Sequence, residues 1–478
     1  YKDHWRGAPV LQEFRLNEIQ GWPDLGRPVY GDDMVKLGGF SGLCYDPISS
    51  TTDQLSFWTV PDRGPNEEPI SGVSGAAGVL RPYKLPNYQA RLVKLNYIKS
   101  QDRVYVDANQ IFLTQKDGVT PISGKGNVPG FDEIPVTRTD ANIYTHADYT
   151  VNGVNYHQLP FDPYGGDFEG VIRDRSGNFW LCDENRPSIY QFNPNGVLIE
   201  RYVPQGTSQL GTDPKPANFY GKETLPAVYS KRWDNRGFEA IAYDPDEDII
   251  YAFIQSPMDN PNSTAVRNKS DVIRILGINP ATGQPVKEFV YLLERNKYAG
   301  FGLNRVDKIG DAVYIGHGIF LVFERDSSVP ANGNTGKKYI FEINTRTATN
   351  ILGTALSQKA SSSGPDDKTL EMMSAEDLVA AGIRPVHKNK LLNLPSIGYL
   401  PSDKAEGLAL IPGGELVVLN DNDFGLAGAG ISDISSFGKI GFKFNYGFDA
   451  SDRSPGIQMQ PRQTLGMYLP DAIASYQV

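Results

Sequence analysis

Phe168-Glu169-Gly170-Val171-Ile172-Arg173-Asp174 is the stretch that decides the fold, because four other segments of the chain resemble it. These segments are residues 40–46, 238–244, 309–315 and 405–411. Repetition of one unit predicts a radial fold, in which the same position of every repeat meets at one axis. That position holds Ser41, Glu169, Glu239, Gly310 and Glu406. Three carboxylates and a hydroxyl at one axis would repel one another unless a cation joined them.

Each repeat continues as a series of short strands. After the repeat at 168–174, a turn at Gly177 leads to apolar runs at 178–182, 188–192 and 197–202. Four short antiparallel strands in each repeat are typical of a β-propeller blade. The sequence therefore predicts an all-β, five-bladed β-propeller, with six blades as the alternative. The last repeat shows only three strands, and we expect the N-terminal segment 10–16 to add the fourth and close the ring.

The chain is interpreted as a single propeller domain over residues 1–478. Three insertions interrupt the blades, at about residues 114–166, 205–236 and 356–390, and the first is polar and rich in Gly and Pro. The third contains a short helical pattern that starts with a cap of the Ser-x-x-acid type at Ser374 and ends at Gly382.

Composition excludes several classes of protein. The 478 residues carry a net charge of −10, which disfavours binding to nucleic acid and is compatible with bound divalent cations. No apolar run reaches the roughly 18 residues of a membrane span. The sequence starts at Tyr1, which we interpret as a mature exported protein (periplasmic, cell-surface or extracellular). Cys44 and Cys182 lie in apolar strand patterns and are expected to be buried free thiols.

A second column of polar residues follows the second strand of each repeat. It contains Asp62, Glu184, Gln255, Arg325 and Asp421, with Arg63, Arg186, Arg236 and Lys404 nearby. Because neighbouring strands are antiparallel, this column should lie on the same face as the first. Carboxylate and hydroxyl oxygens favour a hard cation, most simply Ca²⁺, and no His/Cys pair has the spacing of a zinc site.

Several phrases together resemble one known family. They are Gly39-Phe40-Ser41-Gly42-Leu43, Pro61-Asp62-Arg63-Gly64-Pro65-Asn66, residues 168–189, 235–242, 322–326 and 404–408, and Leu419-Asn420-Asp421-Asn422-Asp423-Phe424-Gly425. This set resembles the phytase-like ("esterase-like activity of phytase") family over residues 35 to 445. The resemblance implies an exported protein whose Glu and Asp residues carry a phosphodiesterase or esterase activity.

A more distant likeness is to the five-bladed calcium-activated nucleotidases, in which Ser and Glu residues from successive blades bind one axial calcium. Ser41, Glu169, Glu239 and Glu406 match that pattern, whereas Gly310 stands where a hydroxyl is expected. A backbone carbonyl, Asp311 or water would have to take its place.

The leading hypothesis is a calcium-dependent hydrolase of phosphate esters. Ca²⁺ would be held by Glu169, Glu239, Glu406 and Ser41, with Gly310 in the fourth repeat, and would polarise a phosphoryl oxygen. One of Asp62, Glu184 or Asp421 would act as general base, while Arg63, Arg186 and Arg325 would hold the anionic substrate.

Two alternatives remain open. One is a non-enzymatic, calcium-stabilised propeller that binds a protein partner or glycan, and the other is a lactone or carboxylester hydrolase. A serine esterase is disfavoured because the sequence lacks a Gly-x-Ser-x-Gly elbow.

Overall fold

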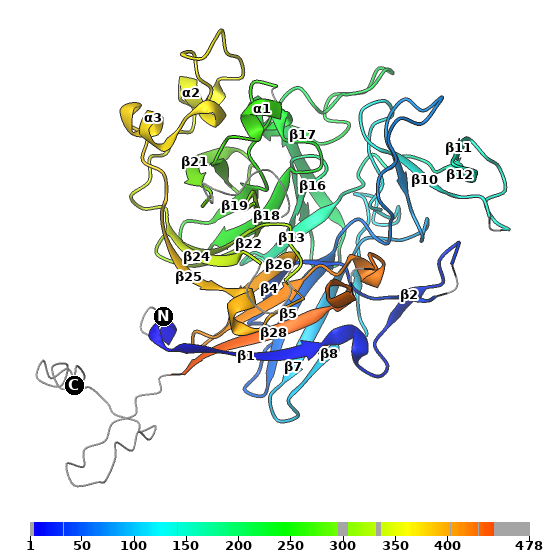
Figure 1. Ribbon diagram of the computed structural model, residues 1–478, viewed down its shortest axis with the longest axis horizontal. Coiled ribbons are helices and arrows are strands. Elements are labelled where there is room, and N and C mark those ends of the chain that lie inside the picture. Colours follow the sequence, from blue (N-terminus) through cyan, green and yellow to red (C-terminus); the bar gives the residue numbers. More distant parts are fainter. Residues whose placement is uncertain are drawn as a thin grey trace, which may run out of the picture.

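The computed structural model describes residues 4–31, 33–140, 142–262, 264–294, 305–330, 336–401, 403–428 and 430–443. Five of its sheets each begin with one of the sequence repeats. The all-β prediction is confirmed, and the strands gather around a common centre as in a propeller-type fold (Figure 1).

The first two sheets have five strands each. The first contains β4 (Phe40–Tyr45), β5 (Gln54–Pro61), β7 (Arg91–Ile98) and β8 (Arg103–Val106), with β9 (Ile111–Phe112) beside β7. The second contains β13 (Phe168–Arg173), β14 (Phe179–Asp183), β15 (Ser188–Phe192), β16 (Leu198–Pro204) and β17 (Lys222–Leu225).

The other three sheets have four strands each. The third contains β18 (Phe238–Asp244), β19 (Ile249–Ile254), β20 (Val272–Ile278) and β21 (Pro285–Leu292). The fourth contains β22 (Lys308–Gly316), β23 (Ile319–Arg325), β24 (Lys338–Asn344) and β25 (His387–Asn393). The fifth contains β26 (Ala405–Leu410), β27 (Leu416–Asn420), β28 (Ser436–Lys443) and β1 (Ala8–Arg15).

The first strands of the five sheets are neighbours around the centre, in the order β4, β13, β18, β22, β26 and back to β4. At the periphery, β1 pairs antiparallel with β28, so that Ala8 lies opposite Lys443 and Arg15 opposite Ser436. The two strands run side by side in Figure 1. The fourth strand of the fifth sheet is therefore supplied by the N-terminal part of the chain.

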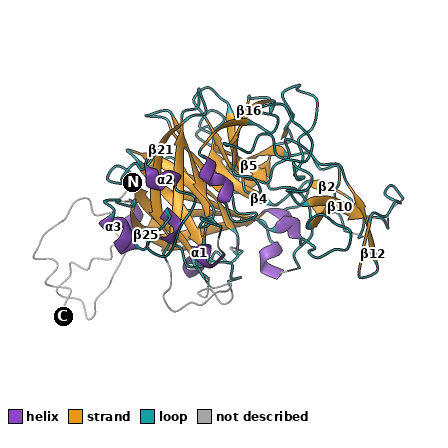
Figure 2. Ribbon diagram, turned by 90° about the horizontal axis from the view of Figure 1, so that it is seen from above, coloured by secondary structure: helices purple, strands orange, loops and turns teal. Residues whose placement is uncertain are grey.

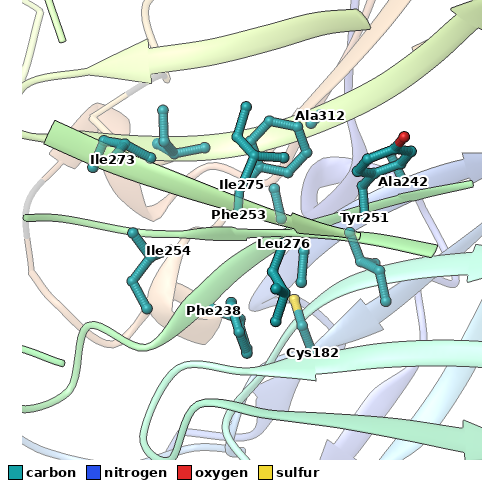
Figure 3. Close-up of a cluster of buried hydrophobic side chains, with 14 of the residues drawn as sticks. Cys182, Phe238, Ala242, Tyr251, Phe253, Ile254, Ile273, Ile275, Leu276 and Ala312 are labelled. Carbon is teal, nitrogen blue, oxygen red and sulfur yellow. The ribbon is translucent and has the colours of Figure 1, made fainter. Parts of the chain in front are cut away.

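The core lies between neighbouring sheets. Its largest apolar cluster joins side chains of the second, third and fourth sheets, including Cys182, Phe238, Phe253 and Ala312 (Figure 3). Large apolar residues on adjacent strands pack well on a pleated surface. Cys44 and Cys182 are free thiols, the first half-buried and the second fully buried.

Two repeats share a buried indole contact. Trp58 Nε1 donates to Asp46 at 3.0 Å, and Trp180 Nε1 donates to Asp174 at 2.8 Å. In both sheets the aspartate ends the repeat and the tryptophan lies on the next strand. The N–H group of a buried indole thus stabilises the corresponding hairpin in each of the two sheets.

The first insertion forms a small sheet of its own. Its strands are β10 (Ile134–Arg138), β11 (Tyr149–Val151) and β12 (Val154–Gln158), together with β6 (Leu80–Pro82) from the preceding loop. This sheet projects beyond the five central sheets (Figure 2).

The other insertions contain short helices and one strand. The second contains β17 and the 3₁₀ turn η3 (Ala227–Lys231), and the third contains α2 (Ala355–Gln358), η4 (Leu370–Met372) and α3 (Ala375–Ala380). Ser374 and Asp377 cap α3 reciprocally, as the sequence predicted.

The remaining short elements connect or flank the sheets. They are η1 (His4–Arg6), η2 (Leu16–Glu18), β2 (Asp24–Gly26), β3 (Val35–Lys36), α1 (Thr264–Arg267), η5 (Leu394–Ile397), η6 (Asp423–Gly425) and η7 (Gly430–Asp433). Among the described residues, no helix has the length and apolar character that crossing a membrane requires.

Asp311 ties three of the central strands together. Its Oδ2 accepts the backbone N–H of Leu43 on β4 (3.2 Å) and of Leu408 on β26 (2.8 Å), while Oδ1 accepts that of Ala312 (2.8 Å). The Asp311 side chain is buried, so water could not take the place of its carboxylate as the acceptor for these N–H groups.

We expect Asp311→Ala to lower the free energy of unfolding by about 2–6 kcal/mol, because the N–H groups of Leu43 and Leu408, the two donors on other strands, lose their buried acceptor at about 1–3 kcal/mol each. Urea denaturation measures this change. Asp213→Ala, at an exposed loop position, is the control and should change stability by less than about 0.5 kcal/mol. Equal stability of the two variants would show that Asp311 does not join the strands.

Candidate functional site

A register shift lies at or next to the repeated position in all five central strands, and in three of them the extra residue is the glutamate itself. On β13, Phe168 pairs with Asp183 and Gly170 with Cys182, so that Glu169 is the extra residue. Glu239 on β18 and Glu406 on β26 are extra in the same way. A bulge re-aims the side chain of the extra residue. The repeated irregularity therefore explains how three glutamates leave the normal alternation of their strands and meet.

The three glutamates converge at the axis. One carboxylate oxygen each from Glu169, Glu239 and Glu406 lies within 4.8 Å of the others. Glu239 is fully buried, and the other two are 4% exposed. The structure thus brings together the three acidic residues that the sequence repeats aligned.

Two polar side chains complete this axial cluster. Ser41 donates from Oγ to Glu406 Oε2 at 3.2 Å, and Gln255 donates from Nε2 to Glu239 Oε2 at 2.6 Å. Arg325 donates to Glu406 Oε1 and lies 3.9 Å from Glu239 Oε1. Arg325 therefore offsets part of the charge of the glutamates.

The cluster fits a hard cation. Oxygens that share one Ca²⁺ at roughly 2.3–2.6 Å must lie within about 5 Å of one another, as these do. Glu239 Oε1 and Gln255 Oε1 are buried and have no hydrogen-bond partner. Burial, followed by the charge of Glu239, raises the pKa of Glu169 well above its usual value, and burial with Glu406 does the same for Glu239. A cation would satisfy both the unpaired oxygens and the excess charge.

The fourth repeat contributes differently. A Cβ at Gly310 would lie 2.1 Å from the carbonyl oxygen of Ala405, so this position has no room for a side chain. Asp311, the neighbouring residue, uses its carboxylate on the backbone of Leu43, Leu408 and Ala312. Gly310, predicted as part of the metal site, can therefore offer backbone atoms only.

Glu184 stands next to the axial cluster. A carboxylate oxygen of Glu184 lies within 4.8 Å of those of Glu169 and Asp167. Asn235 Nδ2 lies 3.4 Å from Glu184 Oε1 on the other side. Burial and the charge of Asp167 raise the pKa of Glu184 to about 7.

Arg63 is enclosed by acidic and amide groups. It donates to Glu133 at 2.8 Å, to Asp167 and to Asn235 Oδ1, and its backbone N–H donates to Asp167 Oδ1 at 3.1 Å. Burial would raise the pKa of Glu133, but Arg63 and Arg81 lower it to about 2. Arg63 is thus a buried link between the first insertion and the axial cluster.

The other predicted residues form separate groups. Asp62 and Asp421 lie close to Asp423, and Lys404 binds Asp421 at 3.2 Å and also Asp423. Arg186 lies 3.7 Å from Asp132 Oδ2, with its guanidinium 5.2 Å from the ring of Tyr220. The second column is therefore divided between an Asp62 side and a Glu184 side.

Sequence reasoning missed Asp167, Glu133 and Asn235. Asp167 directly precedes a repeat, but the equivalent positions in other repeats are Gly39, Gly237, Lys308 and Lys404. These aligned residues share no chemical property, so alignment of the repeats could not indicate a role for Asp167. Glu133 and Asn235 lie in insertions, where only the three-dimensional contact with Arg63 reveals them.

A model of the phytase-like family, described as "esterase-like activity of phytase", matches residues 35–424. The chain belongs to this family. The family's description names an activity of the hydrolase type, and the resemblance expected from the sequence is confirmed.

An uncharacterized secreted protein of Arthroderma benhamiae is 23% identical and matches 84% of this chain and 82% of the relative. That relative is secreted, which bears out the expectation of export.

Solved structures give more distant matches. A luciferin-regenerating enzyme shares 10% identity, with 91% of this chain and 95% of that chain covered and a TM-score of 0.34. Regucalcin from Agrobacterium tumefaciens, described as a calcium-binding protein, shares 12% identity over 88% and 97% of the two chains, with a TM-score of 0.33. Likenesses at such TM-scores carry no argument about the site.

We expect Arg63→Met to lower the free energy of unfolding by about 3–5 kcal/mol, because Asp167 and Glu133 lose a buried counter-ion. Thermal and urea unfolding measure the loss. Arg15→Met, whose side chain is 44% exposed, is the matched control and should cost less than about 1 kcal/mol. A loss at Arg63 no larger than at Arg15 would mean that this link does not stabilise the protein.

Proposed function

We propose that this protein is a calcium-dependent hydrolase of phosphate esters, whose site lies on the axis of a closed five-bladed propeller. The observation that carries the proposal is the convergence of three buried glutamates, with one oxygen of Glu239 that accepts no hydrogen bond and has only Arg325 at 3.9 Å as a counter-charge. Membership of a family named for an esterase-like activity supports the hydrolase part.

Glu169, Glu239 and Glu406 would hold the cation, with Ser41 beside Glu406. When bound, Ca²⁺ would offset the negative charge of the phosphoryl group. Arg325 remains on Glu406 and keeps that carboxylate oriented, so we assign it a positioning role in place of direct substrate contact.

Glu184 is the best general base among the three that the sequence suggested. Its carboxylate borders Glu169, whereas Asp421 pairs with Lys404 and Asp62 lies in that same group. Asn235 lies against one oxygen of Glu184 and is itself held by Arg63, so the base is oriented from behind. Glu184 would take a proton from the attacking water.

A second candidate is a calcium-stabilised scaffold without catalytic activity. Asp311 and Arg325 favour it, because both already join residues of different sheets without any substrate. A lactone or carboxylester hydrolase differs from the first candidate only in its substrate.

The first test is hydrolysis of bis-p-nitrophenyl phosphate and p-nitrophenyl phosphate, with p-nitrophenyl acetate as the carboxylester. We expect phosphate ester turnover that chelator removes and added Ca²⁺ restores. Glu169→Gln should abolish both the activity and the rise in melting temperature that Ca²⁺ produces. A Ca²⁺-dependent melting temperature without turnover of any ester would instead establish the scaffold.

Glu184→Gln should lower kcat by about 10²–10⁴-fold, the usual contribution of a general base, while the stabilisation by Ca²⁺ persists. Steady-state kinetics and thermal unfolding, with and without Ca²⁺, separate the two effects. Glu200→Gln is the control, because Glu200 pairs with Lys116 outside the site. Wild-type kcat in Glu184→Gln would exclude Glu184 as the base.

A further inference from the structure

A pocket of about 250 Å³ opens between the first and second insertions, and one of its lining residues, Asn235, contacts Glu184. Its walls come from residues 77–79 and 130–134 of the first insertion and the loop before it, from Asn185 after β14, and from Arg232, Asp234 and Asn235 of the second insertion. Residues 130–134 lead into β10, whose sheet lies to one side of the central strands in Figure 1. The pocket therefore lies between the insertion and the face that carries the glutamates.

The inner wall of the pocket contacts the site directly. Glu133 binds Arg63 at 2.8 Å, and Asn235 accepts from Arg63 and lies 3.4 Å from Glu184 Oε1. Glu184 in turn borders Glu169. A group in this pocket would be separated from the proposed base by one side chain, Asn235.

The charges in the pocket wall are compensated by other parts of the protein. Glu133 is bound by Arg63 and Arg81, and Arg232 lies 3.4 Å from Asp234. Asp132 accepts the backbone N–H groups of Asn127 and Val128 at 2.9 and 2.8 Å. Because Glu133 and Asp132 are compensated within the protein and the side chain of Asp234 is 92% exposed to water, the wall offers no buried unpaired charge, which favours an uncharged occupant.

Phe131 gives the pocket an apolar surface. It is one of the lining residues, and 60% of its area is exposed. Its backbone N–H donates to Val128 at 3.1 Å, which fixes the turn that presents the ring. An exposed aromatic ring in a concave site, with amide groups nearby, is typical of a surface that binds an organic ligand.

We propose that this pocket binds the alcohol part of the ester and selects an uncharged, ring-sized group. The ring packs on Phe131, and Asn235, whose amide bonds Arg63 and Glu184, forms the wall between this ring and the base. The volume is slightly below the roughly 300–1,000 Å³ of pockets that hold a whole ligand, which suits one part of a substrate. This assignment rests on the proposed function, because it places the other half of the same substrate.

The test compares two esters that differ only in the alcohol, p-nitrophenyl phosphate and methyl phosphate, with full-length protein and added Ca²⁺. Phe131→Ala should lower the ratio of their kcat/KM values about tenfold, mainly through KM for the aromatic ester, as loss of an apolar contact does. Phe112→Ala is the control, because Phe112 is 45% exposed on β9 and does not line the pocket. An unchanged ratio in Phe131→Ala, with hydrolysis intact, would overturn the pocket and leave the proposed function standing.

A second measurement does not depend on turnover. In Phe131→Trp, the nitrophenyl group of p-nitrophenyl phosphate should quench the added indole fluorescence saturably, whereas Phe112→Trp should show no saturable quenching beyond wild type. Saturable quenching in a protein that hydrolyses no ester would support the pocket and refute the proposed function. Absence of such quenching in Phe131→Trp would overturn the pocket even if the enzyme is active.

Discussion

The buried negative charge at the axis is the constraint on which the rest of the structure depends. Carboxylates removed from water are costly unless a counter-charge or hydrogen bonds compensate them. Here Ser41 and Arg325 donate hydrogen bonds to Glu406, and Gln255 donates a hydrogen bond to one oxygen of Glu239. The other oxygen of Glu239 accepts no hydrogen bond, and Arg325 is the single cation for three carboxylates that lie together; this excess of negative charge is the physical reason for assigning a cation to the cluster.

Bringing the glutamates together also requires unusually close backbones. A Cβ at Gly42 would lie 2.8 Å from the carbonyl oxygen of Glu169, and its φ of 75° is one that side chains disfavour. At Gly310 the corresponding clash with Ala405 would be more severe. The departure of the fourth repeat from the Ser/Glu pattern thus has a packing cause, and Asp311 uses the same crowding to reach the backbones of two other strands.

Local repetition made the fold and the axial residues predictable, and it failed where contacts are distant. Glu169, Glu239 and Glu406 could be found because each occupies the same place in a strand pattern, although the bulges that aim them left no signature. Arg63 was correctly noticed as a charged residue at a strand end. Its partners could not be predicted, because Glu133 and Asp167 lie 70 and 104 residues further along the chain. The direction of an arginine depends on such tertiary contacts, and a sequence pattern cannot supply it.

Differences between the five repeats place different side chains around the axial cluster. Around the axial cluster, one group holds Asp62, Asp421 and Asp423, and Lys404 pairs with the last two of these carboxylates. A second group contains Glu184, whose pKa of about 7 reflects burial and the charge of Asp167. Arg63 connects that side to the first insertion through Glu133. A substrate that needs both the axial cluster and a proton acceptor would therefore bind on the Glu184 side, where the insertion forms the neighbouring wall. The repeats determine where the charge gathers, and under the proposed function the insertion would limit the side from which a substrate reaches that charge.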